Sequence, residues 1–584
     1  MADSTEDKAA VISGAEEEAG AMLPTSDDEA AALAAEEPRV EISAKETKID
    51  IGKKEDETEV SQGLTKEELM KFATDPYWVR MRWVLFILFW VIWVAMLVAS
   101  VVIIIYAPKC PSPEPKGWWQ KSPLYNVDME SSGATFAEIE TKLNYLVGTG
   151  VSTLYLSSLF ETSAQAVGTE GTDFNPFDQK FGSLEDWKSL VAALSARDQK
   201  VVIDFIPNHS TDDHWWFKKS EASYNDFKDF YVWRDGSAGT PPNDWKSSSG
   251  DSVWTHSTTR NAWYLHKLGA NKPDLNLENP AVQAELERIL NFWIERGVNG
   301  FVVKDTPFFD DESSDRAISA GTKEIIRRLR ATTDTSTEET GVPCVLYADV
   351  REYPDLGASL YGTQLLENNV GDLIHLPLYN TIMKWDHLIT ATQLKEDIDL
   401  FFEALPENAW PSLTFQAKGG NPKQTDAITM LKMVLPGTGL TLAGEEMGGL
   451  SDPKRWMGAV ASEQESNPHQ QLYSTLANKL RHQEAILYGQ MGRDTTFVLA
   501  GSVFGLTRVK KGNPGYLLAI NLGPEDKMVD MSGLPHLPDS IRLMAKSVNQ
   551  DDGEGVVTKR FESMNVTMNA NESKLFTFVP KFGA

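Results

Sequence analysis

A group of charged and polar residues, together with one glycine, lies within or directly after apolar, strand-like segments in the middle of the chain. Its members are Asp204, Asn208, His209, Lys304, Asp305, Asp349, Lys418 and Gly419. Carboxylates that meet at one site can act as a nucleophile and as a general acid or base. The chemistry open to this group therefore depends on the sheet that positions it.

Strand-like and helical segments alternate from about residue 118 to residue 494. The strand-like segments are 151–156, 200–207, 298–303, 344–350, 372–378, 412–416 and 439–442, and helical spacing is clear over 184–194 and 281–296. Repeated βα units predict an α/β fold with a parallel sheet, and eight such units close a (β/α)8 TIM barrel. From about residue 495 the short strands 497–500, 516–521 and 574–579 predict a C-terminal antiparallel β domain over 495–584.

An uncharged segment, residues 83–106, precedes these elements. Its roughly 24 residues, at about 1.5 Å each, exceed the ~30 Å hydrocarbon core of a bilayer. We therefore expect a transmembrane helix over 81–107, a juxtamembrane neck over 108–117 and the lipid bilayer as a partner. Ala95 and Ala99 have the spacing that lets a second helix approach closely, although such residues are also ordinary in a lipid-facing helix.

Residues 1–80 form a separate acidic zone with a net charge of about −12 and few aromatic residues. Such a segment cannot bury enough apolar surface to offset chain entropy, so we expect a mostly disordered tail. Sequons at Asn565 and Asn571 are used only in the lumen, which favours an exterior C-terminal part and a cytosolic tail. A weak excess of Lys and Arg before the span agrees with this type II orientation.

Charge and cysteine content exclude two classes of protein. The net charge is −29 at pH 7, whereas phosphate binding requires clustered Lys and Arg, so no nucleic-acid partner is expected. Two cysteines, Cys110 and Cys344, are too few for a disulfide-stapled fold. Cys344 lies in an apolar segment and is expected to be a buried thiol. Cys110 follows the span and has no partner within its own loop.

Four motifs in the predicted barrel are similar to those of the α-amylase superfamily. They are Asp204-Phe-Ile-Pro-Asn208-His209, an α-glucosidase-like insertion at about 210–278, Asn299-Gly-Phe-Val-Val-Lys304-Asp305, and the segment from Leu435 to Gly448. The resemblance covers about residues 118–584. It implies a barrel over 118–494 that carries an inserted subdomain, and a sugar cleft at the barrel mouth.

The resemblance also assigns catalytic positions, and this chain departs from the family pattern there. Retaining glycosidases need two carboxyl groups about 5 Å apart, one as nucleophile and one as general acid. The resemblance places Lys304 at the nucleophile and Asp349 at the general acid, which is a glutamate in the family. Gly419, directly after Lys418, takes the position of the third acid. Asp305 would need a bulge to turn inward, since adjacent strand residues face opposite sides.

A membrane anchor followed by an amylase-like domain without its acids resembles the heavy-chain subunits of heteromeric amino-acid transporters. The local likeness, nearest to the 4F2 type, lies in 79–83, 101–110 and Trp118-Trp119. The resemblance implies a non-enzyme without cofactor or metal. It further implies that Cys110 forms a disulfide with a multi-span light chain, which the heavy chain stabilises in the plasma membrane. Contacts with other cell-surface receptors stay open, and the retained insertion departs from the 4F2 type.

Two other functions use the same residues. A membrane-bound maltase would rely on Asp305 and Asp349 as its carboxyl pair. A glycan-binding adhesion receptor would use Asp204, Asn208 and His209, which otherwise hold the barrel mouth by hydrogen bonds. We favour the structural role for these three residues.

Overall fold

The computed structural model describes most of the chain. The described residues are 66–106, 114–160, 177, 180–247, 249–306, 320–351, 354–362, 365–366, 370–371, 373–385, 389–407, 409–417, 422–449, 451–459, 466–548 and 559–582. The chain divides into two compact units, residues 1–110 and 111–584, and each is described by itself. The predictions for Cys110, Lys418 and Gly419 fall outside the described residues.

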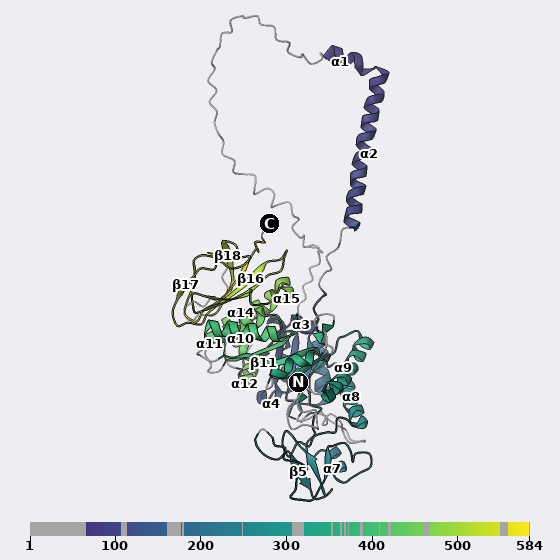
Figure 1. The fold of residues 1–584 in the computed structure, drawn as a ribbon, viewed down its shortest axis with the longest axis vertical. Coiled ribbons are helices and arrows are strands. Elements are labelled where there is room, and N and C mark those ends of the chain that lie inside the picture. Colours follow the sequence, from purple (N-terminus) through teal and green to yellow (C-terminus); the bar gives the residue numbers. More distant parts are fainter. Residues whose placement is uncertain are drawn as a thin grey trace, which may run out of the picture. The chain divides into compact units, whose positions relative to one another are not determined.

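The first unit contains α1 (Lys66–Ala73) and the long helix α2 (Pro76–Tyr106), which are purple in Figure 1. Asp75 caps α2, because its Oδ1 accepts a hydrogen bond of 3.0 Å from the backbone N–H of Tyr77. Pro76 takes the first helical position, where no hydrogen bond is lost. The helix therefore begins at Pro76 rather than at residue 81. Among the described helices, α2 alone is long and apolar enough to cross a membrane, and none of its residues is buried.

The second unit is built on a closed barrel of eight parallel strands, which confirms the predicted fold class. The strands run in the order β1-β13-β12-β11-β8-β7-β3-β2. Their bounds are β1 Leu124–Asp128, β2 Thr153–Ser157, β3 Lys200–Phe205, β7 Gly300–Val303, β8 Val345–Asp349, β11 Leu376–Trp385, β12 Ser412–Ala417 and β13 Thr438–Leu442.

Helices surround the barrel (Figure 1). The longer ones are α5 (Phe136–Gly148), α6 (Leu184–Ser195), α8 (Pro280–Ile294), α9 (Ala320–Thr340), α10 (Ala391–Ala404) and α11 (Pro422–Val434). In α8 the buried residues are Val282, Leu286, Ile289, Leu290 and Trp293, which is the spacing of one helix face. Asn279 caps this helix and Pro280 opens it, so the sequence itself sets where α8 begins.

Successive residues of each barrel strand point alternately into the barrel interior and out toward the helical layer. Val202 and Val302 belong to a cluster with one or two residues from most of the strands, which fills the interior. Their neighbours Ile203 and Phe301 pack in the larger cluster that includes the helices. This two-residue period decides which polar side chains can meet at the barrel mouth.

The insertion between β3 and α8 forms a small sheet of its own, seen with α7 (Trp215–Glu221) at the foot of Figure 1. Its strands are β4 (Trp233–Asp235), β5 (Trp254–Ser257) and β6 (Ala262–Leu265), in the order β4-β6-β5.

The C-terminal part forms a six-stranded antiparallel sheet, as expected, plus a two-stranded one. The six strands are β14 (Thr496–Leu499), β15 (Val503–Arg508), β16 (Gly515–Asn521), β21 (Ser573–Phe578), β18 (Ser540–Lys546) and β19 (Arg560–Glu562). The pair is β17 (Lys527–Val529) with β20 (Val566–Met568).

Two barrel strands differ from the sequence-based expectation. No strand was predicted at β1, a short segment that completes the barrel by pairing with β2 and β13. The strand expected at 372–378 instead runs over Leu376–Trp385 as β11. Its second half pairs with β12 after a register shift between Asn380 and Lys384, and this irregular stretch has no clear strand pattern in the sequence.

Candidate functional site

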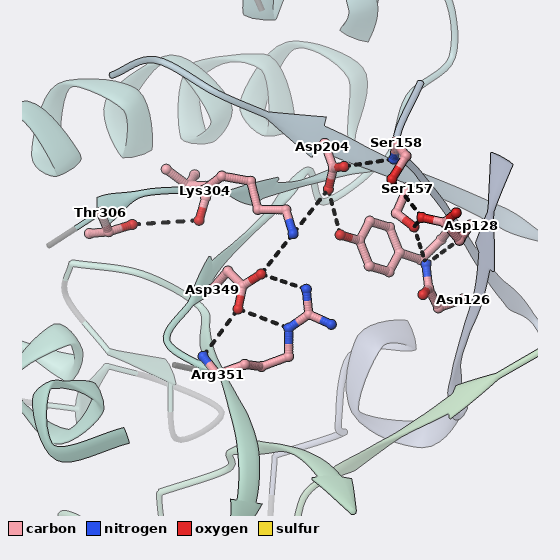
Figure 2. Close-up of polar contacts among 11 residues, drawn as sticks. Asn126, Asp128, Ser157, Ser158, Asp204, Lys304, Thr306, Asp349 and Arg351 are labelled. Atoms are coloured by element: carbon pink, nitrogen blue, oxygen red, sulfur yellow. Dashed lines mark hydrogen bonds and ion pairs between the residues drawn. The ribbon is translucent and has the colours of Figure 1, made fainter. Parts of the chain in front are cut away.

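The carboxyl ends of β3, β7 and β8 bring three of the predicted residues together. Asp204 in β3 has the same strand parity as the interior residue Val202. Lys304, directly after β7, has the parity of Val302. Asp349, the last residue of β8, has the parity of Tyr347. All three side chains therefore project toward the barrel mouth from neighbouring strands (Figure 2).

Lys304 is held by both aspartates. Its Nζ lies 2.7 Å from Oδ2 of Asp349 and 3.8 Å from Oδ1 of Asp204. The Lys304 side chain is 21% exposed, and those of Asp349 and Asp204 are 14% and 5% exposed. The ammonium group therefore fills the space between the two carboxylates, as Figure 2 shows.

Arg351 completes this cluster, although it was not among the predicted residues. Its Nη2 lies 2.6 Å from Oδ2 of Asp349, and its Nε donates to Oδ1 at 2.9 Å. This bidentate contact fixes the carboxylate plane. Arg351 lies two residues beyond the end of β8, where strand alternation no longer applies, so the sequence pattern offered no signal for it. Two aspartates and two cations thus form a cluster with no net charge, here called the mouth cluster (Asp204, Lys304, Asp349 and Arg351).

The other side of Asp204 faces β2. Tyr155 donates its hydroxyl hydrogen to Oδ1, and the backbone N–H of Ser158 donates to Oδ2 at 2.9 Å. Asp204 therefore accepts hydrogen bonds at both oxygens while it pairs with Lys304. Tyr155 was also missed, because an aromatic residue inside a strand is usually a core residue.

The electrostatics of the mouth cluster keep Asp349 and Lys304 charged. Burial by itself would raise the pKa of Asp349, but hydrogen bonds and charge from Arg351 and Lys304 hold it well below its ordinary value. Burial would lower the pKa of Lys304, but the charges of Asp204 and Asp349 outweigh this and raise it. A carboxyl group held in this way stays ionised at neutral pH and has no proton to donate.

The remaining predicted residues form a second, adjacent cluster. The Nε2 atom of His209 lies 3.5 Å from Oδ2 of Asp305. Asn208 donates to Oδ1 of Asp274 at 3.4 Å. Asp274 is 3% exposed, and burial raises its pKa to about 7. Asn208 and His209 are also buried, so these residues tie the start of the inserted segment to its end.

Asp305 does not follow the simple strand alternation. The strand β7 ends at Val303, and Asp305 adopts a left-handed backbone with φ of 58°. The side chain turns toward His209 without the bulge that was considered, because alternation applies only within a strand. No hydrogen bond or ion pair joins Asp305 to Asp349 among the described residues, so the two do not form a direct pair.

Three further predictions concern positions away from the barrel mouth. Asn565 is exposed, and Asn571 is partly exposed in a turn before β21. Ala95 and Ala99 line one apolar groove along α2, together with Trp90 and Val98. Cys344 is 3% exposed just before β8, and burial raises the pKa of its thiol to about 12. This Cys344 environment agrees with the expected core thiol.

The barrel and the N-terminal region match known families. The family described as alpha amylase, catalytic domain, matches residues 124–325. The family described as solute carrier family 3 member 2 N-terminus matches residues 46–125. The chain is 30% identical over 434 residues to the human amino acid transporter heavy chain SLC3A1. The aligned region covers 66% of this chain, and it spans only 61% of the length of that relative.

Sugar-processing enzymes are similar as well. Maltase 1 of Drosophila virilis is 26% identical over 563 residues, with 78% of this chain and 86% of the maltase covered. The solved structure of an α-glucosyl transfer enzyme, XgtA, superposes with a TM-score of 0.62 at 19% identity and covers 79% of this chain. At that identity the superposition establishes the fold alone. Taken together, the barrel and the family matches show that the chain is a heavy-chain-like protein of the α-amylase superfamily.

Proposed function

We propose that this chain is the non-catalytic heavy chain of a heteromeric amino-acid transporter, linked by a disulfide from Cys110 to a multi-span light chain. In this role it brings the light chain to the plasma membrane and stabilises it there. The observation that carries the proposal is the Lys304–Asp349 ion pair, at the two positions that the motif resemblance assigns to the nucleophile and the general acid of a glycosidase.

The chemistry of the mouth cluster supports the absence of glycoside hydrolysis. An ammonium group cannot form the glycosyl ester that a retaining mechanism requires. The neighbouring Asp349 is held ionised by Lys304 and Arg351, whereas a general acid needs a raised pKa. A sugar at this site would also have to displace Lys304 from two carboxylates.

The membrane segment supports a role beside another membrane protein. The apolar groove at Ala95 and Ala99 on α2 offers a close approach to a second helix. A type II orientation places the barrel outside the cell, where the exposed Asn565 and the turn residue Asn571 can accept glycans. Glycosidase digestion of the full chain should shift its gel mobility, and Asn565→Gln with Asn571→Gln should abolish the shift.

A non-reducing gel of native membranes tests the disulfide. The full chain should migrate as a heavier complex that collapses on reduction, and Cys110→Ser should eliminate the complex. Cys344→Ala is the matched control, because the Cys344 thiol is buried and its raised pKa disfavours exchange. A complex that survives Cys110→Ser would refute the disulfide.

The maltase relatives favour one competing function, hydrolysis of α-glucosides. Glucose release from maltose by the purified full chain tests it, with Asp349→Asn as the diagnostic variant. We expect no turnover above a protein-free blank. Robust turnover that Asp349→Asn abolishes would replace the heavy-chain proposal with an enzyme. Saturable glycan binding lost in Asp204→Ala would instead indicate an adhesion receptor.

A further inference from the structure

A cavity of about 750 Å³ lies at the end of the barrel opposite the mouth cluster. Trp410, which precedes β12, lines it, whereas Lys304 follows β7, and the barrel strands are parallel. The cavity also reaches Tyr488 at the end of α15 (Glu484–Tyr488) and Arg508 at the end of β15. It therefore lies where the barrel base meets the C-terminal sheet, and we call it the base cavity.

Lys116 points its ammonium group into this space. The residue is 4% exposed, and its Nζ lies 4.6 Å from the ring centroid of Trp410 and 5.6 Å from that of Tyr488. The ammonium forms no hydrogen bond or ion pair with any described residue. The backbone is fixed in place, because the N–H of Lys116 donates to the Tyr488 hydroxyl at 3.1 Å.

Two buried arginines add positive charge without a matching acid. Arg508 is fully buried and donates to the carbonyls of Gln490 and Ile486 at 2.9 and 2.8 Å. Its Nε has no acceptor among the described residues. Arg481 is 1% exposed and donates only to backbone carbonyls, such as that of Gly437 at 2.7 Å. In the part of the chain that the structure describes, neither guanidinium pairs with a carboxylate.

Burying a cation without a carboxylate partner costs free energy, and the pKa of the Lys116 ammonium reflects this cost. Burial, followed by the charge of Arg508, lowers the pKa of Lys116 to about 8, although the charge of Glu114 acts in the opposite direction. A carboxylate or another anion beside Lys116 would offset this cost. Four acidic residues also line the cavity: Asp399 pairs with Lys395, Glu403 pairs with Arg493, and Glu407 and Asp494 are exposed. This negative charge disfavours a ligand with several anionic groups.

We propose that the base cavity binds a small organic molecule with one carboxylate and an apolar body. The carboxylate pairs with Lys116 in the positive field of Arg508, and the body packs on Trp410 and Tyr488. The volume of the cavity falls within the range of about 300–1,000 Å³ that is typical of small-molecule sites. Apolar side chains such as Phe402 and Leu405 also line the cavity. The site is independent of the light-chain proposal.

Calorimetric titration of the full chain in lipid nanodiscs tests the proposal. The probes are 4-phenylbutyrate and indole-3-acetate, each with its neutral amide. We expect saturable binding of at least one acid at one site per chain, with its amide at least ~30-fold weaker, as for loss of one partner of a buried charge pair. Absence of saturable binding by both acids, or equal binding of acid and amide, would overturn the proposal.

Lys116→Met is the decisive variant, because it keeps the apolar stem and removes only the charge. It should weaken binding of the acid ~30-fold, whereas Lys188→Met, at a side chain 55% exposed, should leave binding unchanged. Thermal unfolding shows whether the variant is folded, and the acid should raise Tm only when Lys116 is present. Displacement of the probe by equimolar inorganic phosphate would assign a simple anion site and overturn the assignment of an apolar carboxylate.

Discussion

The buried cations at the two ends of the barrel have different partners: carboxylates at the mouth, and aromatic rings or backbone carbonyls at the base. In the mouth cluster, Lys304 and Arg351 pair with Asp204 and Asp349, so the charges cancel. In the base cavity, Lys116 rests on aromatic rings and Arg508 donates to carbonyls, without a carboxylate partner among the described residues. The comparison teaches that the cations at the mouth are neutralised by carboxylates of the barrel itself, whereas Lys116 and Arg508 at the base lack such direct partners among the described residues.

The largest expected effect comes from removing the cation that the mouth cluster shares. Lys304→Ala leaves Asp204 and Asp349 beside each other without it, so the free energy of unfolding should fall by about 2–4 kcal/mol. Urea unfolding of the full chain in detergent micelles measures the change. Lys188→Ala, which removes an exposed ion pair with Glu185, should change stability by less than about 0.5 kcal/mol. Equal losses in the two variants would remove the distinction between paired and surface charge.

A double-mutant cycle measures the pair itself. Lys304→Met takes one of two cations from Asp349, and Asp349→Asn takes the nearer of two carboxylates from Lys304, whereas the double variant removes both members of the pair. The double variant should therefore be more stable than the two single losses predict, by about 1–3 kcal/mol. Strict additivity of the unfolding free energies would show that the 2.7 Å contact contributes nothing.

Acid unfolding sharpens the same comparison. The pKa of Asp349 is lower in the folded chain than in the unfolded chain, so the unfolded state takes up the proton first. The stabilisation is therefore present above the unfolded pKa of about 4 and is lost as the pH falls below it. Urea midpoints between pH 6 and pH 2.5 should fall less steeply in Asp349→Asn than in the wild type. Parallel curves would contradict the assigned direction.

The smallest expected effect, of opposite sign, belongs to the base cavity. Lys116→Met removes an unpaired buried charge and should raise the free energy of unfolding by about 1 kcal/mol at pH 7. The pKa of Lys116 is about 8 when folded and higher when unfolded, so wild-type stability should rise as the pH rises above 8. The advantage of the variant should therefore shrink by pH 9.5. A destabilised Lys116→Met protein at pH 7, without added ligand, would show that the cation is already satisfied.

Much of the fold was accessible from local patterns. Buried strands such as β3 and amphipathic helices such as α8 have periodicities and caps that depend only on nearby residues. The strand β1 was missed because its five residues resemble any short apolar segment until β2 and β13 pair with them. The register shift in β11 likewise depends on the partner strand β12.

The candidate site divides in the same way. Strand parity and a family motif were enough to place Lys304 and Asp349 at the mouth. The roles of Tyr155 and Asp274 were not accessible, because each depends on a partner dozens of residues away, Asp204 and Asn208 respectively. The left-handed turn at Asp305 ends the alternation that the sequence-based expectation assumed.

The sequence by itself determined the apolar span and the barrel class, because composition and periodicity are local properties. Only the tertiary structure decided that Lys304 neutralises two aspartates and that Lys116 lies unpaired among aromatic rings. The physical reason is that the energy of a buried charge depends on which distant groups surround it, and the folded chain alone sets those distances.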